Sequence, residues 1–168
     1  PGRVSTHLIV GLGETEEDVV SLAASMCQQG VTVGLFAFTP LAGTRLADRQ
    51  SPDLGSYRRI QLCCYLLKRA YLEHPAASPP EFRFSSGRLA SISIPRRVAQ
   101  VGALWGEAFQ TSGCPGCNRP YYNERPGKIP YNYPRPLTPV EVDDAVAAAL
   151  DGVELDMESA SIEGGSTR

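Results

Sequence analysis

Apolar and polar residues are grouped in blocks over the first part of the chain, and each block predicts one element. Residues 4–10 form a short apolar run, which is typical of a strand covered on both faces in a parallel sheet. Gly11 and Gly13 then break the run. Thr15, with Asp18 three residues later, is typical of a capped helix start, and apolar residues at helical spacing follow. We therefore expect a strand, a glycine turn and a helix.

A second strand and a longer helix are predicted next. Gly30 ends the first helix, and residues 31–38 form an apolar, partly β-branched run that favours a strand. Turn signals at Ser51-Pro52 open a helix with a buried apolar stripe, which ends before Pro75. The basic side chains of this helix are expected on its solvent-facing side: Arg58, Arg59, Lys68 and Arg69.

Two further strands are predicted beyond residue 80. Residues 81–85 alternate between apolar and polar and should form a strand that ends at Ser86-Gly87. Pro95 suits the first turn of a helix, and residues 107–111 are expected to form a fourth strand. Because strands alternate with helices, the pattern predicts an α/β fold with right-handed crossovers and a parallel sheet, which is half of an eight-stranded (β/α) barrel.

The rest of the chain divides into three segments after this partial barrel of residues 1–112. Residues 113–137 are rich in Pro and Tyr and have no strand or helix period, which predicts an irregular strap. It would either cover the barrel mouth or pack outside as an extended tail, and we favour the cover. Residues 138–152 begin with a capping signature and predict a C-terminal helix, and residues 153–168 are expected to be a disordered tail.

Length and composition narrow the class of protein. The 168 residues, 42% of them hydrophobic, suffice for one domain with a core but not for a complete eight-stranded barrel. The chain starts at Pro1 and not at a Met, so we expect further residues before it. Charged residues or Pro interrupt every apolar run and no signal peptide is recognisable, so we expect a soluble, cytoplasmic protein that does not enter a membrane.

The net charge of −2 gives no general attraction to nucleic acid or to an anionic membrane. Basic residues are nevertheless concentrated between residues 83 and 135, where eight of them stand against two acidic residues. This segment would either face an anionic ligand or partner, or form a solvated basic face whose acidic counterparts lie elsewhere in the fold.

The five cysteines do not indicate a disulfide framework. Cys27, Cys63 and Cys64 lie in helical patterns where a small apolar side chain would serve, which fits a reducing cytoplasm. Cys114 and Cys117 have the two-residue gap that lets both sulfurs bind one metal ion. The alternatives for this pair are a metal site completed by other ligands and free or redox-active thiols.

The two glycine turns occupy positions where ligands commonly bind. In parallel sheets and barrels the site lies outside the carboxyl ends of the strands, which here are residues 11–14 and 38–44. A glycine at such a position lets a flat ring approach the backbone. A plain tight turn would equally account for Gly-Leu-Gly.

Three segments in this order resemble the radical S-adenosylmethionine superfamily, most closely its biotin synthase and lipoyl synthase branch. HLIVGLGE is similar to the family's adenine-contact motif, Gly-x-Ile-x-Gly-x-x-Glu, with Ile9, Gly11 and Glu14 matching and His7 replacing the first glycine. FTPLAGTRL resembles the next strand end with its Pro-x-x-Gly-Thr turn, and FSSGR resembles the Ser-Ala-Gly-Arg strand of biotin synthases.

The resemblance implies a barrel in which a [4Fe–4S] cluster reductively cleaves S-adenosylmethionine to a 5′-deoxyadenosyl radical that abstracts a substrate hydrogen. It implies sulfur insertion or related C–H chemistry on a small-molecule or carrier-bound acyl substrate. An electron donor such as ferredoxin or flavodoxin is implied too, and a second radical subunit is possible by analogy. The implied cofactor-binding residues are Ile9, Gly11, Gly13, Glu14, Phe38 and Pro40.

The chain also departs from the family pattern. The motif Cys-x-x-x-Cys-x-x-Cys is missing, so we expect the C-terminal half of a longer enzyme that is inactive alone. Ser5 stands where biotin synthases have an auxiliary-cluster cysteine, whereas Arg88 matches that cluster's arginine ligand. Arg88 would bind a cluster or an anion, or else pair with a carboxylate such as Glu107. The tail with Cys114 and Cys117 resembles lipoyl-synthase-like enzymes that work as pairs, and these cysteines would bind an auxiliary cluster.

Two other functions compete with this interpretation. One is a non-catalytic module that holds a structural zinc ion at Cys114 and Cys117. The other is a barrel enzyme with a different nucleotide-like ligand, because glycine turns at strand ends do not specify which ligand they bind.

Overall fold

The N-terminal third of the chain forms a strand, a helix and a second strand, as predicted. The computed structural model describes residues 4–76, 78–95, 102–112 and 127–157. Strand β1 (Val4–Val10) pairs in parallel with strand β2 (Val31–Ala37), and helix α1 (Glu16–Gln28) connects them. The Thr15 hydroxyl accepts the Asp18 N–H at 3.1 Å while the Asp18 carboxylate accepts the Thr15 N–H at 2.9 Å, which confirms the capping box.

The two faces of the β1–β2 sheet differ in their surroundings. Side chains alternate between the faces of a strand, and the face that contains Val10, Leu35 and Ala37 is buried against the helices. On the opposite face Ser5, His7 and Ile9 are exposed. The expectation that β1 is covered on both faces was therefore wrong for the described part of the protein.

The longer helix lies where it was predicted, but its polar side was misjudged. Helix α2 (Leu54–Lys68) begins at Asp53, whose carboxylate accepts the Ser56 N–H at 2.9 Å, and continues into the π-helical turn η1 (Arg69–Glu73). Its apolar stripe is buried as expected. Arg58 and Arg59, however, are 1% and 6% exposed, so the prediction that they face solvent was wrong.

A second sheet contains the remaining strands. Strand β3 (Glu81–Ser85) pairs with strand β4 (Arg88–Ile94) as an antiparallel hairpin, and strand β5 (Glu154–Met157) lies parallel to β4 on its other side. The turn consists of Ser86 and Gly87, whose φ angles of 50° and 78° are both positive. The predicted third strand is thus confirmed, but it joins a different sheet with an antiparallel neighbour.

Two predictions for the second half of the chain were wrong. Residues 107–111, expected as a fourth strand, overlap the 3-10 helix η2 (Gly102–Phe109). Part of the tail that was expected to be disordered forms β5, because its backbone pairs with the edge of β4. The described residues form a mixed α/β fold with two small sheets, and they do not close a barrel.

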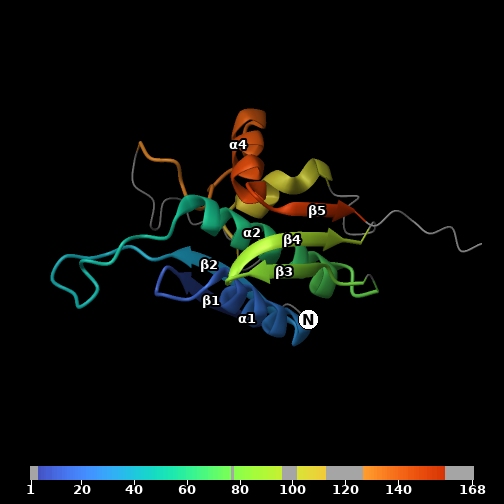
Figure 1. The fold of residues 1–168 in the computed structure, drawn as a ribbon, viewed down its shortest axis with the longest axis horizontal. Helices are drawn as coiled ribbons and strands as arrows, with labels where there is room; N and C mark the ends of the chain where they lie inside the picture. The colour runs from blue at the N-terminus through green and yellow to red at the C-terminus, as the bar shows by residue number, and fades with distance from the viewer. Residues whose placement is uncertain (1–3, 77, 96–101, 113–126, 158–168) are drawn as a thin grey trace, which may run out of the picture.

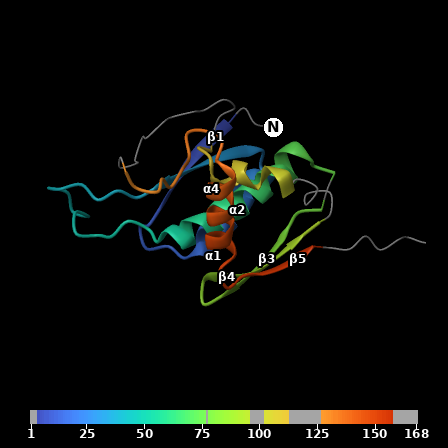
Figure 2. The same cartoon turned by 90° about the horizontal axis from the view of Figure 1, so that it is seen from above.

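The helices form a layer between the two sheets (Figures 1 and 2). Helix α4 (Pro139–Leu150), whose capping box at Thr138 and Glu141 was predicted, packs against α2 with Ala145 and Ala149 buried. One core contains buried residues from β2, α1, α2 and β4, so both sheets pack on the same helices. No helix of the described segments is long and apolar enough to cross a bilayer.

Candidate functional site

The carboxyl ends of β1 and β2 meet at one end of the first sheet. The loop after β1 and the longer loop after β2 both leave from this end (Figure 1). The Phe38 N–H donates to the Val10 carbonyl at 2.8 Å, so the pairing of the strands extends one residue beyond β2. Residues from the two predicted turns are therefore neighbours, as expected for adjacent parallel strands.

Gly11 is packed tightly against the second loop. It has a φ of +108°, and a Cβ at this position would lie 2.9 Å from Pro52 Cδ and 3.2 Å from Phe38 Cβ. Any larger residue would meet both a backbone conformation that L side chains rarely adopt and a steric clash. The protein's own side chains thus account for this glycine, and the space beside it is filled by Pro52.

Glu14 holds the loop that contains Gly11. Its carboxylate accepts a hydrogen bond from the Gly11 N–H and a second one, of 2.9 Å, from the Leu12 N–H. Two backbone donors satisfied by one carboxylate fix the shape of a short turn. Glu14 is therefore a positioning residue for the loop in this structure.

Apolar side chains border the same loop. Ile9 and Leu12 are 51% and 41% exposed, so apolar surface of both side chains is open to solvent. Phe38 and Pro40 are half-buried. On the same sheet face as Ile9, the His7 and Phe36 rings contact edge to face with centroids 4.9 Å apart. We call Ile9, Leu12 and Phe38 the apolar shelf.

Gly13 lies under the loop that joins β2 to α2. Its φ is +116°, and a Cβ there would be 2.6 Å from Arg49 Nη2. Arg49 is exposed and belongs to the loop that joins β2 to α2. Sequence reasoning did not single out this arginine, because nothing in its local pattern distinguishes it from other exposed arginines.

The Arg88 side chain binds backbone carbonyls of residues that are far from the apolar shelf in the sequence. Its Nη2 donates to the Asp151 carbonyl at 2.6 Å and its Nη1 to the Gly152 carbonyl at 3.4 Å, directly after α4. The carboxylate suggested as its partner, Glu107, instead accepts a hydrogen bond from the Tyr65 hydroxyl at 3.4 Å. Arg88 thus stabilises the C-terminal end of α4 and the turn into β5.

The described residues offer no ligand set for an iron–sulfur cluster or a zinc ion. Among them, no three His, Cys, Asp or Glu side chains lie close enough to share a metal ion. Cys27, Cys63 and Cys64 are free and buried, and burial raises the pKa of all three thiols. Cys114 and Cys117 lie outside the described residues.

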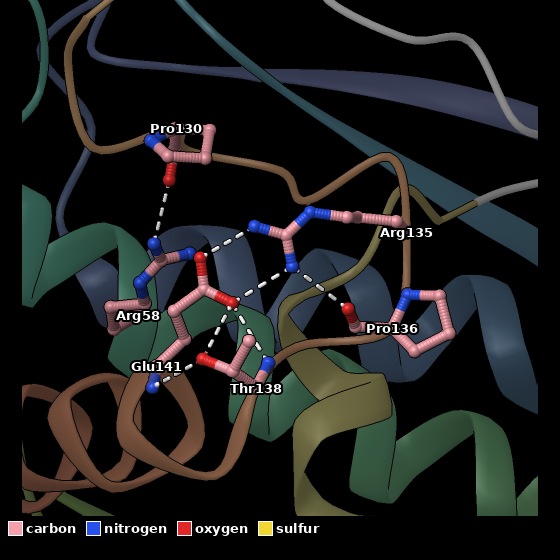
Figure 3. A network of polar contacts seen from close by, with 6 residues as sticks. All are labelled: Arg58, Pro130, Arg135, Pro136, Thr138 and Glu141. Carbon is pink, nitrogen blue, oxygen red and sulfur yellow. Dashed lines mark hydrogen bonds and ion pairs between the residues drawn. The ribbon is translucent and has the colours of Figure 1, made fainter.

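The described end of the strap is bound to α2 by Arg58 (Figure 3). The guanidinium of this buried residue donates to the carbonyls of Pro130 and Tyr131, both at 2.6 Å. It also lies over the rings of Phe109 and Tyr133, at 5.4 and 5.2 Å from their centroids. Residues 113–126, which include the rest of the proposed cover, lie outside the described residues.

A second buried arginine joins three elements. Arg59 on α2 forms an ion pair of 2.8 Å with Glu16 on α1, and both side chains are 7% exposed. The Glu16 carboxylate also accepts the Leu89 N–H of β4 at 2.8 Å. This pair therefore fixes the N-terminal end of α1, next to the Gly11–Glu14 loop, against the second sheet.

Comparisons of the chain with protein-family models, curated proteins and solved structures found no match.

Proposed function

We propose that the apolar shelf binds the adenosyl group of S-adenosylmethionine, as part of a radical iron–sulfur enzyme of the biotin synthase and lipoyl synthase-like branch. The observation that carries the proposal is the exposure of Ile9 and Leu12 beside a loop whose shape Glu14 fixes. Exposed aliphatic groups on a preorganised loop suit the flat face of an aromatic ring such as adenine. Within this proposal, the β1–α1–β2–α2 unit is part of the second half of a barrel.

The fit to the two cofactors of such an enzyme is uneven. The shelf residues Ile9 and Phe38 suit an adenosyl group, whereas the spaces beside Gly11 and Gly13 are filled by Pro52 and Arg49. The described residues do not suit a [4Fe–4S] cluster, since they contain no clustered ligands. We therefore propose that residues outside the described segments hold the cluster.

The binding part of the proposal can be tested by calorimetry. We expect the full-length protein to bind S-adenosylhomocysteine, and the substitution Ile9→Asp to weaken binding at least about tenfold, because a carboxylate against a nucleobase loses apolar contact and must be desolvated. Val140→Asp is the matched control, since Val140 is 68% exposed on α4. Equal affinities of Ile9→Asp and the parent protein would remove the shelf from the binding site.

The enzymatic part needs a separate measurement. After reconstitution with iron and sulfide and chemical reduction, the full-length protein should convert S-adenosylmethionine to 5′-deoxyadenosine. The full-length protein is also titrated with ATP by calorimetry. A barrel enzyme that uses another nucleotide would bind ATP in preference to S-adenosylhomocysteine. Preferential binding of ATP, or the absence of 5′-deoxyadenosine from a protein with a full complement of iron and sulfide, would contradict the radical-enzyme assignment.

A further inference from the structure

The β3–β4 hairpin is joined to the start of α1 by two hydrogen bonds. The Glu17 N–H donates to the Gly87 carbonyl at 3.2 Å, and the Leu89 N–H donates to the Glu16 carboxylate at 2.8 Å. Figure 2 shows the turn of the hairpin beside the start of α1. Because Glu16 and Leu89 are 73 residues apart in the sequence, these bonds join the second sheet to a distant part of the fold.

Gly87 also packs directly on the residue that caps α1. A Cβ at residue 87 would lie 2.7 Å from Thr15 Cγ2 and 2.8 Å from Thr15 Cβ. The φ of Gly87 is +78°, a conformation that L side chains rarely adopt. Any side chain at residue 87 would therefore displace either the turn or Thr15.

Thr15 connects this contact to the loop beside the apolar shelf. It directly follows Glu14, whose carboxylate accepts hydrogen bonds from the Gly11 and Leu12 N–H groups. The next residue, Glu16, is fixed by its ion pair with Arg59 on α2. A displacement of Thr15 would therefore be taken up by the Gly11–Glu14 loop, because the helix on the other side of Thr15 is held in place.

The same hairpin is bound to the end of α4 as well. Arg88 donates to the carbonyls of Asp151 and Gly152, directly after α4. Residues 86–88, which resemble a biotin synthase motif, thus contact α1 through Gly87 and the end of α4 through Arg88. Both contacts of this segment are made to other parts of the same chain.

We propose that the turn between β3 and β4 positions the Gly11–Glu14 loop for its ligand. Gly87 is the positioning residue, because it acts on the loop through Thr15 and Glu14. The effect on ligand affinity rests on the proposed function, whereas the effect on the shape of the loop does not.

Hydrogen–deuterium exchange of residues 11–14, measured by mass spectrometry on the full-length protein without ligand, tests the effect on the loop. Gly87→Ala should speed the exchange of the Gly11 and Leu12 amides at least about tenfold, because a displaced Thr15 weakens their hydrogen bonds to Glu14. Gly127→Ala is the matched control, since Gly127 has the same φ of +78° but nothing within 4 Å of a Cβ. Equal exchange of residues 11–14 in the two variants would overturn the inference.

A double variant separates the contact with Thr15 from a general loss of stability. Thr15→Gly removes both atoms that a Cβ at residue 87 would meet, and glycine is an acceptable N-cap residue. In this background Gly87→Ala should change the exchange much less than in the parent protein. If Gly87→Ala alone does not fold, folding of the double variant supports the contact and its failure to fold overturns it.

Binding of S-adenosylhomocysteine, measured by calorimetry, distinguishes this inference from the proposed function. Gly87→Ala should bind the ligand at least about tenfold more weakly than the parent, and Gly127→Ala should bind it equally well. Unchanged affinity in Gly87→Ala would refute the effect on the ligand. A parent protein that does not bind S-adenosylhomocysteine would contradict the proposed function, while the exchange measurement would still decide whether Gly87 positions the loop.

Discussion

Glu141 is a carboxylate that its neighbours keep ionised. It accepts hydrogen bonds from Arg135 Nη1 at 2.8 Å and Nη2 at 2.7 Å, and from the Thr138 N–H at 2.8 Å (Figure 3). The Arg135 bond is the largest cause, and the Thr138 backbone the next, of a pKa lowered from 4.5 to about 2. The pair holds the end of the strap to the first turn of α4.

The lowered pKa of Glu141 predicts how the stabilisation from its contacts depends on pH. Because the folded-state pKa of Glu141 lies below its ordinary value, its stabilisation is complete above pH 4.5 and is lost as the pH falls toward about 2. Thermal unfolding should therefore show a lower Tm for Glu141→Gln than for the parent at neutral pH. This difference in Tm should become smaller as the pH is lowered. Glu17→Gln, at an exposed carboxylate in the first turn of α1, is the control. A gap that widens on acidification would contradict this assignment.

At the residue scale, the sequence predicts contacts between near neighbours well. Both capping boxes could be predicted because the two residues of each box, Thr15 and Asp18 or Thr138 and Glu141, are three residues apart. The roles of Arg58 and Arg88 could not be predicted, because their main partners are 73 and 63 residues away in the sequence. Of the candidate site, the neighbourhood of Gly11 and Phe38 was predictable from strand order, whereas Arg49 was not.

At the scale of elements, Arg58 is the main link between α2 and the strap. Its guanidinium also donates to Gln61 at 2.7 Å, and the Gln61 amide donates to the Tyr131 carbonyl at 2.9 Å. Replacing Arg58 with an apolar residue would leave carbonyl groups of the strap buried without the donors of Arg58. Burying a carbonyl group without a hydrogen bond costs free energy.

We therefore expect Arg58→Met to lower the free energy of unfolding by about 3 kcal/mol, because three charge-assisted hydrogen bonds are lost while part of the packing is retained. Urea denaturation measures this change, with the denaturation midpoint falling and the slope unchanged. Arg45→Met, at an exposed site, should have little effect. A stability of Arg58→Met within about 0.5 kcal/mol of the parent would show that Arg58 does not hold the strap.

The turn between β3 and β4 has a hairpin signal in the sequence. Ser86-Gly87 lies between two strand-like runs, and a two-residue loop with positive φ at both positions is the commonest hairpin connection. The sequence analysis predicts the turn and a helix start at Pro95, but it predicts no strand over residues 88–94, which form β4. An alternating pattern alone does not state whether the next strand joins the same sheet.

At the scale of the whole molecule, the Glu16–Arg59 pair joins the helical layer to the second sheet. It joins α1 to α2, and the Leu89 N–H of β4 joins the second sheet to the same carboxylate. Strand order gave the α/β class, yet it could not reveal that the strands separate into two sheets, because that choice depends on long-range packing of Leu89, Ile92 and Ile94 on the helices.

Removing one partner of the Glu16–Arg59 pair should lower the stability of the protein. We expect Glu16→Gln to destabilise the protein by about 3 kcal/mol, because Arg59 keeps a buried charge without its counterion. The double variant Glu16→Gln with Arg59→Met should recover part of this loss, since no charge then remains buried. Differential scanning calorimetry of the single and double variants tests the coupling, and additive effects would mean that the two side chains act independently.

Strand β1 has a consequence for how the protein behaves at high concentration. Among the described strands it is paired on one side only, and its seven residues include no Lys, Arg, Asp, Glu or Pro. Natural edge strands usually contain such residues, which block the addition of a strand from another chain. In the 168-residue chain by itself, intermolecular aggregation should therefore begin at β1, and a lysine at Val4, which is 61% exposed, is the simplest change to suppress it.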